Sequence, residues 1–316
     1  MNVAMNYGRM LHSLQPELRA GGTDLSERRR SGVSTGPIRQ IEPTAEMLQI
    51  AWGPDGGLRI GSYVTIAKLA ADGRCRATYP GLTAAAQGLA TPQIRNVGTI
   101  GGNLAQRSRC WYYRNPHLAC LKKGDAVCSA RKGNHLYGVN FDLGPCVAPH
   151  PSTLAAALMA YDALVTTTLR GAIPAETLIG DGSDGTRDNT LAADEIIQFI
   201  DLAAPVAGER AAYQRVISRA YAEWPLVEAV IRIVLVERRV AMVRLAIGGV
   251  APVPLRLPGI EAMATGELLN AGLIGAVARA TTAGAQPLPM TGYKTALLEG
   301  LVIDMLTQLA TGRPKR

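Results

Sequence analysis

Four of the five cysteines of this 316-residue chain lie between residues 110 and 146. This segment has almost no apolar periodicity, so no helix or strand in it would bury a hydrophobic face. A loop of this length inside a compact chain needs either a function or an internal clamp. The odd cysteine count and the absence of a signal-peptide pattern favour reduced thiols over a disulfide framework. The segment therefore predicts thiols that are available to a metal.

The four cysteines have the spacing C-x9-C-x7-C-x17-C. Structural zinc usually takes pairs of ligands from C-x2–4-C turns, and no such turn is present. Four widely spaced thiolates are typical of a larger iron–sulfur cluster. His117, His135 and His150 lie in or beside the segment and could also serve as ligands. From the spacing alone, an iron–sulfur cluster, a zinc ion and unliganded thiols all remain open. Cys75, the remaining cysteine, is predicted to be a buried apolar residue.

The apolar pattern divides the chain into three parts, of which the first two surround the cysteines. Residues 1–60 contain short apolar runs separated by Gly, Pro and Asp, which predict brief strands with one intervening helix. Residues 61–203 begin with helical patterns over residues 62–90 and continue into the cysteine segment. A helix and then a strand are expected after the last of the four cysteines.

The third part, residues 204–316, has a different pattern. Apolar and polar residues alternate over 230–236 and 241–247, which predicts a half-buried antiparallel hairpin. Helices are expected near 260–280 and over 290–312. A sheet with covering helices describes a separate α+β domain, so the whole chain is predicted to be of the α+β class.

Composition and charge exclude several classes of protein. A chain of this length with 47% hydrophobic residues can bury a sizeable core. No run of eighteen apolar residues is present, so we expect no membrane span. The net charge of +8 suggests an acidic partner. The only dense basic run, Arg28-Arg29-Arg30, lacks interleaved aromatic residues and is interpreted as a solvated helix or loop end, so no nucleic-acid partner is expected.

Two glycine pairs, Gly21-Gly22 and Gly101-Gly102, are candidates for a phosphate site. Glycine allows a positive φ and lets a ligand approach the backbone without meeting a Cβ, so successive N–H groups can converge on a phosphate. Each pair has a Thr beside it, at Thr23 and Thr99. Together the loops could hold one diphosphate from both sides. Taken singly, each pair also fits an ordinary tight turn.

A third glycine-rich stretch, residues 180–185, has the literal G-x-G-x-x-G spacing of dinucleotide-binding loops. Asp181 and Asp184 would place two carboxylates beside a pyrophosphate, and no convincing helix follows the stretch. It is interpreted as a surface turn. No G-x-x-x-x-G-K-[ST] pattern is present, so nucleotide hydrolysis has no support.

Three strings occur in one order along nearly the whole chain: AGGTDL at 20–25, IRNVGTIGGN at 94–103 and AIGGVAPVPLR at 246–256. Together they resemble the FAD-binding medium subunit of the molybdenum hydroxylases, which include xanthine dehydrogenase, carbon monoxide dehydrogenase and bacterial aldehyde oxidoreductases. The resemblance implies a two-part FAD-binding domain of the vanillyl-alcohol-oxidase (PCMH) type, with parts at 1–60 and 61–203. A C-terminal α+β domain of the CO dehydrogenase flavoprotein type would occupy 204–316.

The same resemblance implies the residues of the FAD site, with the two glycine loops holding the diphosphate of noncovalently bound FAD. They are Ala20, Gly21, Gly22, Thr23, Asp24, Leu25, Ile94, Thr99, Ile100, Gly101, Gly102, Asn103 and Thr153. The family usually has Asp where this chain has Thr153, which puts its flavin contact in doubt. Glu223 is also unusual, and Trp224 either flanks the flavin or, as we favour, fills the domain interface. The N-terminus is shorter than usual, so the first strand is expected to be reduced.

The cysteine segment narrows the resemblance further. RSRCWYYR at 107–114 and CVAPHPS at 146–152 are similar to an insertion in the flavin subunit of periplasmic-type aldehyde oxidoreductases and, more distantly, of 4-hydroxybenzoyl-CoA reductase. In those relatives four cysteines bind a [4Fe-4S] cluster. The resemblance therefore implies that a [4Fe-4S] cluster is bound by Cys110, Cys120, Cys128 and Cys146.

The function implied by the resemblance is that of an electron-transfer flavin subunit of a molybdenum-dependent aldehyde oxidoreductase. Its partners would be a large molybdenum-cofactor subunit and a small [2Fe-2S] subunit, with an external electron acceptor. The chain has no molybdenum-cofactor pocket and no [2Fe-2S] cysteine pattern, so no catalytic residue is assigned to it. It would be cytoplasmic, or periplasmic by co-export with a signal-bearing partner. The alternatives are a flavin subunit serving an aromatic acyl-CoA or a purine, and a nonenzymatic zinc or scaffold protein.

Overall fold

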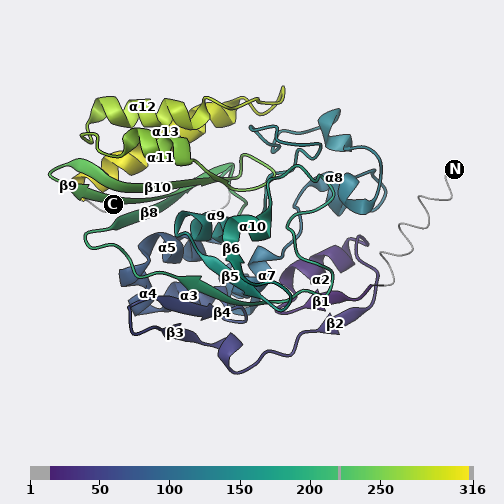
Figure 1. Cartoon of the computed structure of the whole chain (residues 1–316). Coiled ribbons are helices and arrows are strands. Elements are labelled where there is room, and N and C mark those ends of the chain that lie inside the picture. Colours follow the sequence, from purple (N-terminus) through teal and green to yellow (C-terminus); the bar gives the residue numbers. More distant parts are fainter. Residues whose placement is uncertain (1–14, 220–221, 313–316) are drawn as a thin grey trace.

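A computed structural model describes residues 15–219 and 222–312 (Figure 1). The first part of the chain is small: strand β1 (Glu17–Arg19) pairs in parallel with β2 (Ile38–Gln40), and helix α2 (Thr23–Arg30) connects them. Residues 1–14 and the pair 220–221 lie outside the described residues. Among the described helices, none is both long and apolar enough to cross a bilayer.

A five-stranded antiparallel sheet forms the centre of the second part, in the order β3-β4-β7-β5-β6. The predicted division at residue 60 falls inside β4, which pairs on one side with β3 and on the other with β7. The division between the first two sheets lies before β3 instead. Strand β4 pairs with β7, a strand far along the chain, so both β3 and β4 belong to the second sheet. The strands are β3 (Ile50–Trp52), β4 (Leu58–Gly61), β5 (Leu164–Thr167), β6 (Gly171–Pro174) and β7 (Ile197–Leu202).

The two helical patterns expected between residues 62 and 90 correspond to the short helices α3 (Ile66–Ala71) and α5 (Pro80–Gly88), and α4 (Gly73–Thr78) lies between them. Their apolar faces and the sheet enclose one hydrophobic core, in which Cys75 is fully buried, as predicted. Burial raises the pKa of the Cys75 thiol to about 12. The helices are η1 (Glu46–Leu48), α3 (Ile66–Ala71), α4 (Gly73–Thr78), α5 (Pro80–Gly88), α6 (Pro92–Val97), α7 (Ile100–Leu104) and α10 (Ala175–Ile179).

Helix α9 (Thr153–Ala160) lies at the centre of the molecule (Figure 1). All eight of its residues are buried, and it packs against α5, β9 and β10. Ser152 caps its N-terminus by accepting a hydrogen bond from the amide of Ala155. An almost entirely apolar sequence suits a helix that is enclosed on every side. This helix joins the part of the chain with the five-stranded sheet to the C-terminal domain.

The segment between α7 and α9 has little regular structure, as its sequence predicts. It holds only three single-turn elements: α8 (Trp111–Arg114), η2 (Leu121–Lys123) and η3 (Ser129–Arg131). Internal clamps fix it: Arg131 donates two hydrogen bonds to Asp142, at 2.8 and 2.6 Å. The amides of Asn140 and Phe141 both donate to the carbonyl of Val250, at 2.6 and 2.9 Å, which docks the segment on the C-terminal domain.

The C-terminal domain has a four-stranded antiparallel sheet in the order β11-β10-β9-β8, covered on one face by helices (Figure 1). The predicted hairpin is confirmed. Its two-residue turn is formed by Glu237 and Arg238, whose φ values of 50° and 65° match the turn type that follows the twist of a hairpin. The elements are β8 (Arg210–Val216), β9 (Val227–Val236), β10 (Arg239–Gly248), β11 (Leu255–Arg256), α11 (Pro258–Ala264), α12 (Ala271–Thr282) and α13 (Tyr293–Thr311).

Candidate functional site

The two glycine loops lie against each other, although about eighty residues separate them in the sequence. A Cβ on Gly21 would lie 2.0 Å from the carbonyl oxygen of Val97, so only glycine allows this approach. Gly22 has a φ of 71°, in the left-handed region that favours glycine, and it begins α2. A Cβ on Gly101 would lie 2.8 Å from that of Ser62. Three of the four glycines are therefore required by the backbone itself.

Both loops line one cavity of about 300 Å³, whose remaining walls come from α6, the start of β7 and the segment before β9. Two of the predicted FAD contacts do not line it. Ile100 is buried in the hydrophobic core, and Thr153 is the buried first residue of α9. The predicted residues that do line it are Ala20, Gly21, Gly22, Thr23, Asp24, Leu25, Ile94, Thr99, Gly101, Gly102 and Asn103.

The two loops differ in the amides they can offer to a phosphate. At the start of α2, the amides of residues 23–25 donate to no other described residue, and no side chain caps this end. Free N–H groups and the positive end of the helix dipole suit an anion. Near α7 the amides are already used: those of Ile100, Gly101 and Gly102 donate to Val64 O, Ser62 O and Thr99 Oγ1, at 3.0, 2.9 and 3.1 Å.

The two loops therefore offer different groups to a ligand. The hydrogen bonds favour α2 as the source of backbone donors and the Thr99–Asn103 loop as a surface that a ligand can approach closely. A Cβ on Gly102 would meet only Thr99 Oγ1, at 2.9 Å, so the space beyond it belongs to the cavity. The residues present therefore fit a bound diphosphate.

Asp24 connects the first glycine loop to the cysteine segment. Its carboxylate pairs with Arg28 at 3.2 Å, with Arg109 at 3.0 Å and with Arg114 at 2.7 Å. It also accepts a hydrogen bond from the amide of Arg107, at 3.2 Å. Burial alone would raise the pKa of Asp24, but the three guanidinium groups outweigh it and lower the pKa. The carboxylate therefore stays ionised and holds the cavity wall against the start of the cysteine segment. Of the basic run, Arg28 is paired in this way and is not simply solvated.

Thr153 has a protein partner in place of a flavin contact. Its hydroxyl donates to Glu228, at 2.8 Å, and the hydroxyl of Tyr213 donates to the same oxygen at 2.9 Å. All three groups are buried or nearly so. Burial raises the pKa of Glu228, and the two hydrogen bonds only partly offset this effect. The Thr153 hydroxyl thus fixes α9 to the C-terminal sheet.

The four cysteines of the segment share one electrostatic environment. Burial raises the pKa of each of Cys110, Cys120 and Cys146, in the case of Cys120 to about 11. Neighbouring thiols contribute to each shift: Cys128 acts on Cys110 and Cys146, and both of these act on Cys120. The thiols therefore lie near enough to influence one another electrostatically, although the sequence spreads them over residues 110–146. Among the described residues, no three His, Cys, Asp or Glu side chains form a group that could hold a single metal ion.

The histidines near the cysteines have other partners. His150 Nε2 lies 3.0 Å from the carbonyl oxygen of Asp188, and His135 Nδ1 lies 3.1 Å from that of Ala130. Burial lowers the pKa of His150 to about 4, so this side chain is neutral near pH 7. These contacts do not favour the alternative of histidine ligands.

Asp188 organises the cysteine segment, and no feature of the sequence marked it. Its buried carboxylate pairs with Arg107 at 2.9 Å and with Lys122 at 3.0 Å, and it accepts the amide of Ser108 at 3.2 Å. Burial would raise the pKa of Asp188, but the two cations lower it. Asp188 follows the glycine-rich stretch 180–185, whose exposed Asp181 and Asp184 each cap a local turn, as expected of a surface loop. Only the fold shows that the next carboxylate is buried.

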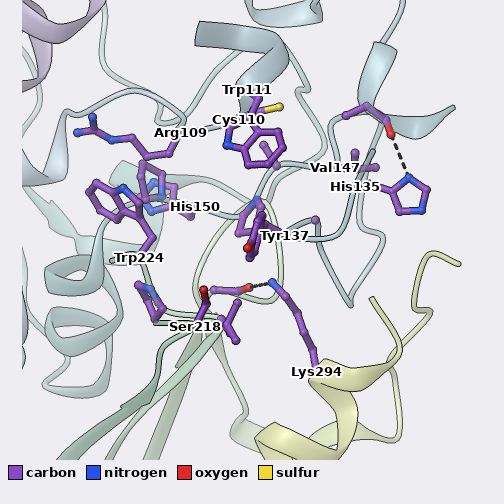
Figure 2. Close-up of a pocket in the computed structure, with 18 of the residues that line it drawn as sticks. Arg109, Cys110, Trp111, His135, Tyr137, Val147, His150, Ser218, Trp224 and Lys294 are labelled. Carbon is purple, nitrogen blue, oxygen red and sulfur yellow. Dashed lines mark hydrogen bonds between the residues drawn. The ribbon is translucent and has the colours of Figure 1, made fainter. Parts of the chain in front are cut away.

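Trp224 forms part of two cavities. It lines the flavin-site cavity and a second one beside the cysteine segment, and the guanidinium of Arg109 lies 4.6 Å from its ring centre. Figure 2 shows the two side chains next to each other at one end of the second cavity. We expected Trp224 to fill the domain interface. Its side chain is 40% exposed, so it does not act as a simple filler there. Glu223 accepts the amide of Arg219, at 3.0 Å.

Family comparisons match this arrangement. Residues 9–204 match the model of the FAD binding domain in molybdopterin dehydrogenase. Residues 211–309 match that of the CO dehydrogenase flavoprotein C-terminal domain. The boundary between the matches falls where the five-stranded sheet ends and the four-stranded sheet begins.

Comparisons with individual proteins agree. The chain is 32% identical over 251 residues to the aldehyde oxidoreductase FAD-binding subunit PaoB of Escherichia coli strain K12, covering 77% of each chain. A xanthine dehydrogenase FAD-binding subunit from Escherichia coli O157:H7 is 43% identical over 91 residues, covering 28% of this chain and 31% of that one. A carbon monoxide dehydrogenase structure from Hydrogenophaga pseudoflava has the same fold, with a TM-score of 0.72 and 21% identity over 96% of this chain and 92% of that one. The chain therefore belongs to the family of FAD-binding subunits of the molybdenum hydroxylases.

Proposed function

We propose that this chain is the electron-transfer flavin subunit of a molybdenum-dependent aldehyde oxidoreductase. The observation that carries the proposal is the meeting of two glycine loops at one cavity, next to a cysteine segment, in a chain of this family. The similarity to the aldehyde oxidoreductase subunit spans most of the chain, including the cysteine segment's position. The shorter match to a xanthine dehydrogenase subunit supports the second candidate, a flavin subunit serving a purine.

The FAD diphosphate would bind at the start of α2, where the amides of residues 23–25 have no described partner. Ala20, Gly21 and Gly22 would let the phosphates approach the backbone, and the loop Thr99–Asn103 would form the opposite wall. Bound FAD would supply redox chemistry in one-electron and two-electron steps, which suits a link between iron–sulfur centres and an external acceptor.

We expect Gly102→Val to yield flavin-free protein, because the added side chain displaces the Thr99 hydroxyl and extends into the cavity. Flavin occupancy is measured by absorbance and by release of FAD on denaturation. Gly300→Val is the matched control, since Gly300 is also helical and a Cβ there meets no atom within 4 Å. Normal flavin occupancy in Gly102→Val would remove the loop from the FAD site.

A [4Fe-4S] cluster on Cys110, Cys120, Cys128 and Cys146 is the second part of the proposal. The gathering of four thiols in a segment with little regular structure supports it, because a bound cluster would organise a loop that buries little apolar surface. Arg109, Arg114, Lys122 and Lys123 would favour the more negative, reduced state of the cluster. Iron and sulfide analysis should give about four of each per flavin. A zinc content of one per chain would reject the cluster.

The partners would be a large molybdenum-cofactor subunit and a small [2Fe-2S] subunit. The relatives are named as FAD-binding subunits, and the net charge of +8 suits acidic patches on partner chains. The complex would work in the cytoplasm, or in the periplasm after co-export with a signal-bearing partner. Size-exclusion chromatography of the three co-expressed chains should show one complex that carries both flavin and molybdenum.

A further inference from the structure

The second cavity, of about 300 Å³, lies between the cysteine segment and the C-terminal domain. Its walls are largely aromatic and apolar, from Trp111, Tyr112, Tyr137 and Val147 (Figure 2). The rings of Trp111 and Tyr137 meet edge to face, with centres 5.8 Å apart. Trp224 separates this cavity from the flavin site. No step of the proposed electron transfer uses it.

A buried cation without a counter-ion lies at one side of this cavity. Lys294, in the first turn of α13, lines the cavity with only 1% of its surface exposed. Figure 2 shows its side chain reaching from α13 to a backbone carbonyl, that of Gly249, to which Nζ donates at 2.7 Å. No carboxylate within the described residues pairs with it. An ammonium group has three N–H donors, so two of them lack a partner.

Such a group is costly unless something compensates for it. A buried charge is normally paired, and a buried donor without an acceptor costs free energy. Burial lowers the pKa of Lys294 to about 7, with no neighbouring charge to oppose the effect. A ligand with a negative charge would restore both the missing counter-ion and the missing acceptors.

A second polar atom in the cavity also lacks a partner. His135 lines the same cavity and is 8% exposed, and its buried Nε2 makes no hydrogen bond with the described residues. Its Nδ1 faces the carbonyl oxygen of Ala130, which only accepts, so the proton is assigned to Nδ1. Nε2 is then a buried acceptor without a partner among the described residues, at the edge of the cavity.

The remaining charges of the lining are mainly positive. Arg109 and Arg219 line the cavity together with Lys294, and Glu223 is the acidic residue of the lining. Glu223 already accepts the backbone amide of Arg219, at 3.0 Å, and lies 3.8 Å from the guanidinium of the same residue. Arg109 is likewise paired with Asp24, at 3.0 Å, so Lys294 is the one cation of the described lining without a carboxylate partner, and an anion is favoured beside it.

We propose that this cavity binds a small aromatic carboxylate, with the carboxylate on Lys294 and the ring against Trp111 and Tyr137. The aromatic walls favour a flat ring, through stacked or edge-to-face contacts. A cavity of about 300 Å³ is at the lower end of the range for small-molecule sites, which suits a single ring. The proposal goes beyond the flavin subunit's role and does not depend on which substrate the complex oxidises.

The proposal is tested by calorimetric titration of the purified full-length chain with benzoate and with its neutral isostere benzamide. Wild-type protein should bind one benzoate and should bind benzamide at least tenfold more weakly. Lys294→Met should weaken benzoate binding at least tenfold. Lys132→Met should leave it unchanged, because this lysine of the cysteine segment is exposed and does not line the cavity.

Three results would overturn the proposal: no benzoate binding to wild type, equal binding of benzoate and benzamide, or full benzoate affinity in Lys294→Met. The first two comparisons use only the wild-type protein, so they hold even if the Lys294 variant does not fold. Tyr137→Ala provides a further test, since it removes ring contact without changing charge. Unchanged benzoate affinity in that variant would exclude the proposed pose against the aromatic wall.

Discussion

At the residue scale, the molecule depends on a few buried charges whose partners come from distant parts of the chain. Asp24 and Asp188 each hold cations of the cysteine segment, one from the α2 loop and the other from the loop before β7. Each carboxylate remains ionised because its cations outweigh the cost of burial. Lys294 is the opposite case, a buried cation whose pKa falls because nothing opposes its burial.

Asp188→Asn should destabilise the protein by about 3 kcal/mol at pH 7, since it leaves Arg107 and Lys122 without their buried counter-ion. The folded-state pKa of Asp188 is lowered, so its contribution is present above the unfolded pKa and is lost as the pH falls through the folded value. Urea unfolding at pH 7 and at pH 3, which lies below the unfolded pKa, measures both effects. The difference between wild type and Asn variant should shrink at pH 3, and a pH-independent difference would contradict this account.

Lys294→Met should stabilise the ligand-free protein by roughly 1–3 kcal/mol at pH 6. The folded pKa of about 7 lies below the ordinary lysine value of 10.5, so the unfolded state binds more protons between these values and wild-type stability rises with pH across that window. The variant should lack this rise, while Lys132→Met should keep it. Thermal unfolding at pH 6 and pH 9 provides the measurement. A less stable Met variant at pH 6 would show that the lysine's bond to Gly249 outweighs its burial cost.

At the element scale, the regular parts of the chain follow from local sequence and the cysteine segment does not. Alternation over β9 and β10 and helical spacing along α13 predict those elements with nearly correct bounds. The two helical patterns between residues 62 and 90 predict α3 and α5, whereas the separate helix α4 between them was not predicted. The boundary at residue 60 was misplaced because β4 pairs with β7, a contact between residues about 140 positions apart that no local pattern reveals.

The candidate site likewise has some features that the sequence predicts and others that only the fold reveals. The glycine pairs and the four cysteines are visible as sequence motifs, and the fold brings the two glycine pairs to one cavity. Asp188, Glu228 and Lys294 were not predicted, because a charged residue in a sequence carries no sign that it will be buried. The fold also decides which loop has free amides. The backbone amides of Ile100 and Gly101, at the start of α7, donate to carbonyl oxygens of residues that precede α3.

Loss of one cysteine should release the segment between α7 and α9. We expect Cys120→Ser to lower the iron content and to expose the segment to trypsin at Lys122, Lys123 or Arg131, because the loop has few regular elements of its own. Cys75→Ala is the control, since that thiol lies in the core of the five-stranded sheet and should not affect iron. Iron analysis and mass spectrometry of the tryptic fragments report the two effects. Full iron content in Cys120→Ser would remove this residue from the ligand set.

At the scale of the whole molecule, α9 packs between helix α5 and the C-terminal sheet, and the cysteine segment docks on both parts of the chain. Trp224 and Arg109 lie where the two cavities meet. Sites for a flavin, a cluster and a small anion would then lie close together at one junction between domains. A subunit built in this way suits the passage of electrons between partners, and it offers no assigned group for oxidising a substrate by itself.

The central claim is that this chain transfers electrons but does not oxidise the aldehyde. It is tested most directly by following flavin absorbance near 450 nm, a region of oxidised-flavin absorption, after anaerobic addition of an aromatic aldehyde. With the molybdenum and [2Fe-2S] subunits assembled, the absorbance should bleach; with the isolated chain, it should not change. Flavin bleaching by aldehyde in the isolated chain would contradict the account, as would a fully assembled, molybdenum-loaded complex whose flavin stays oxidised.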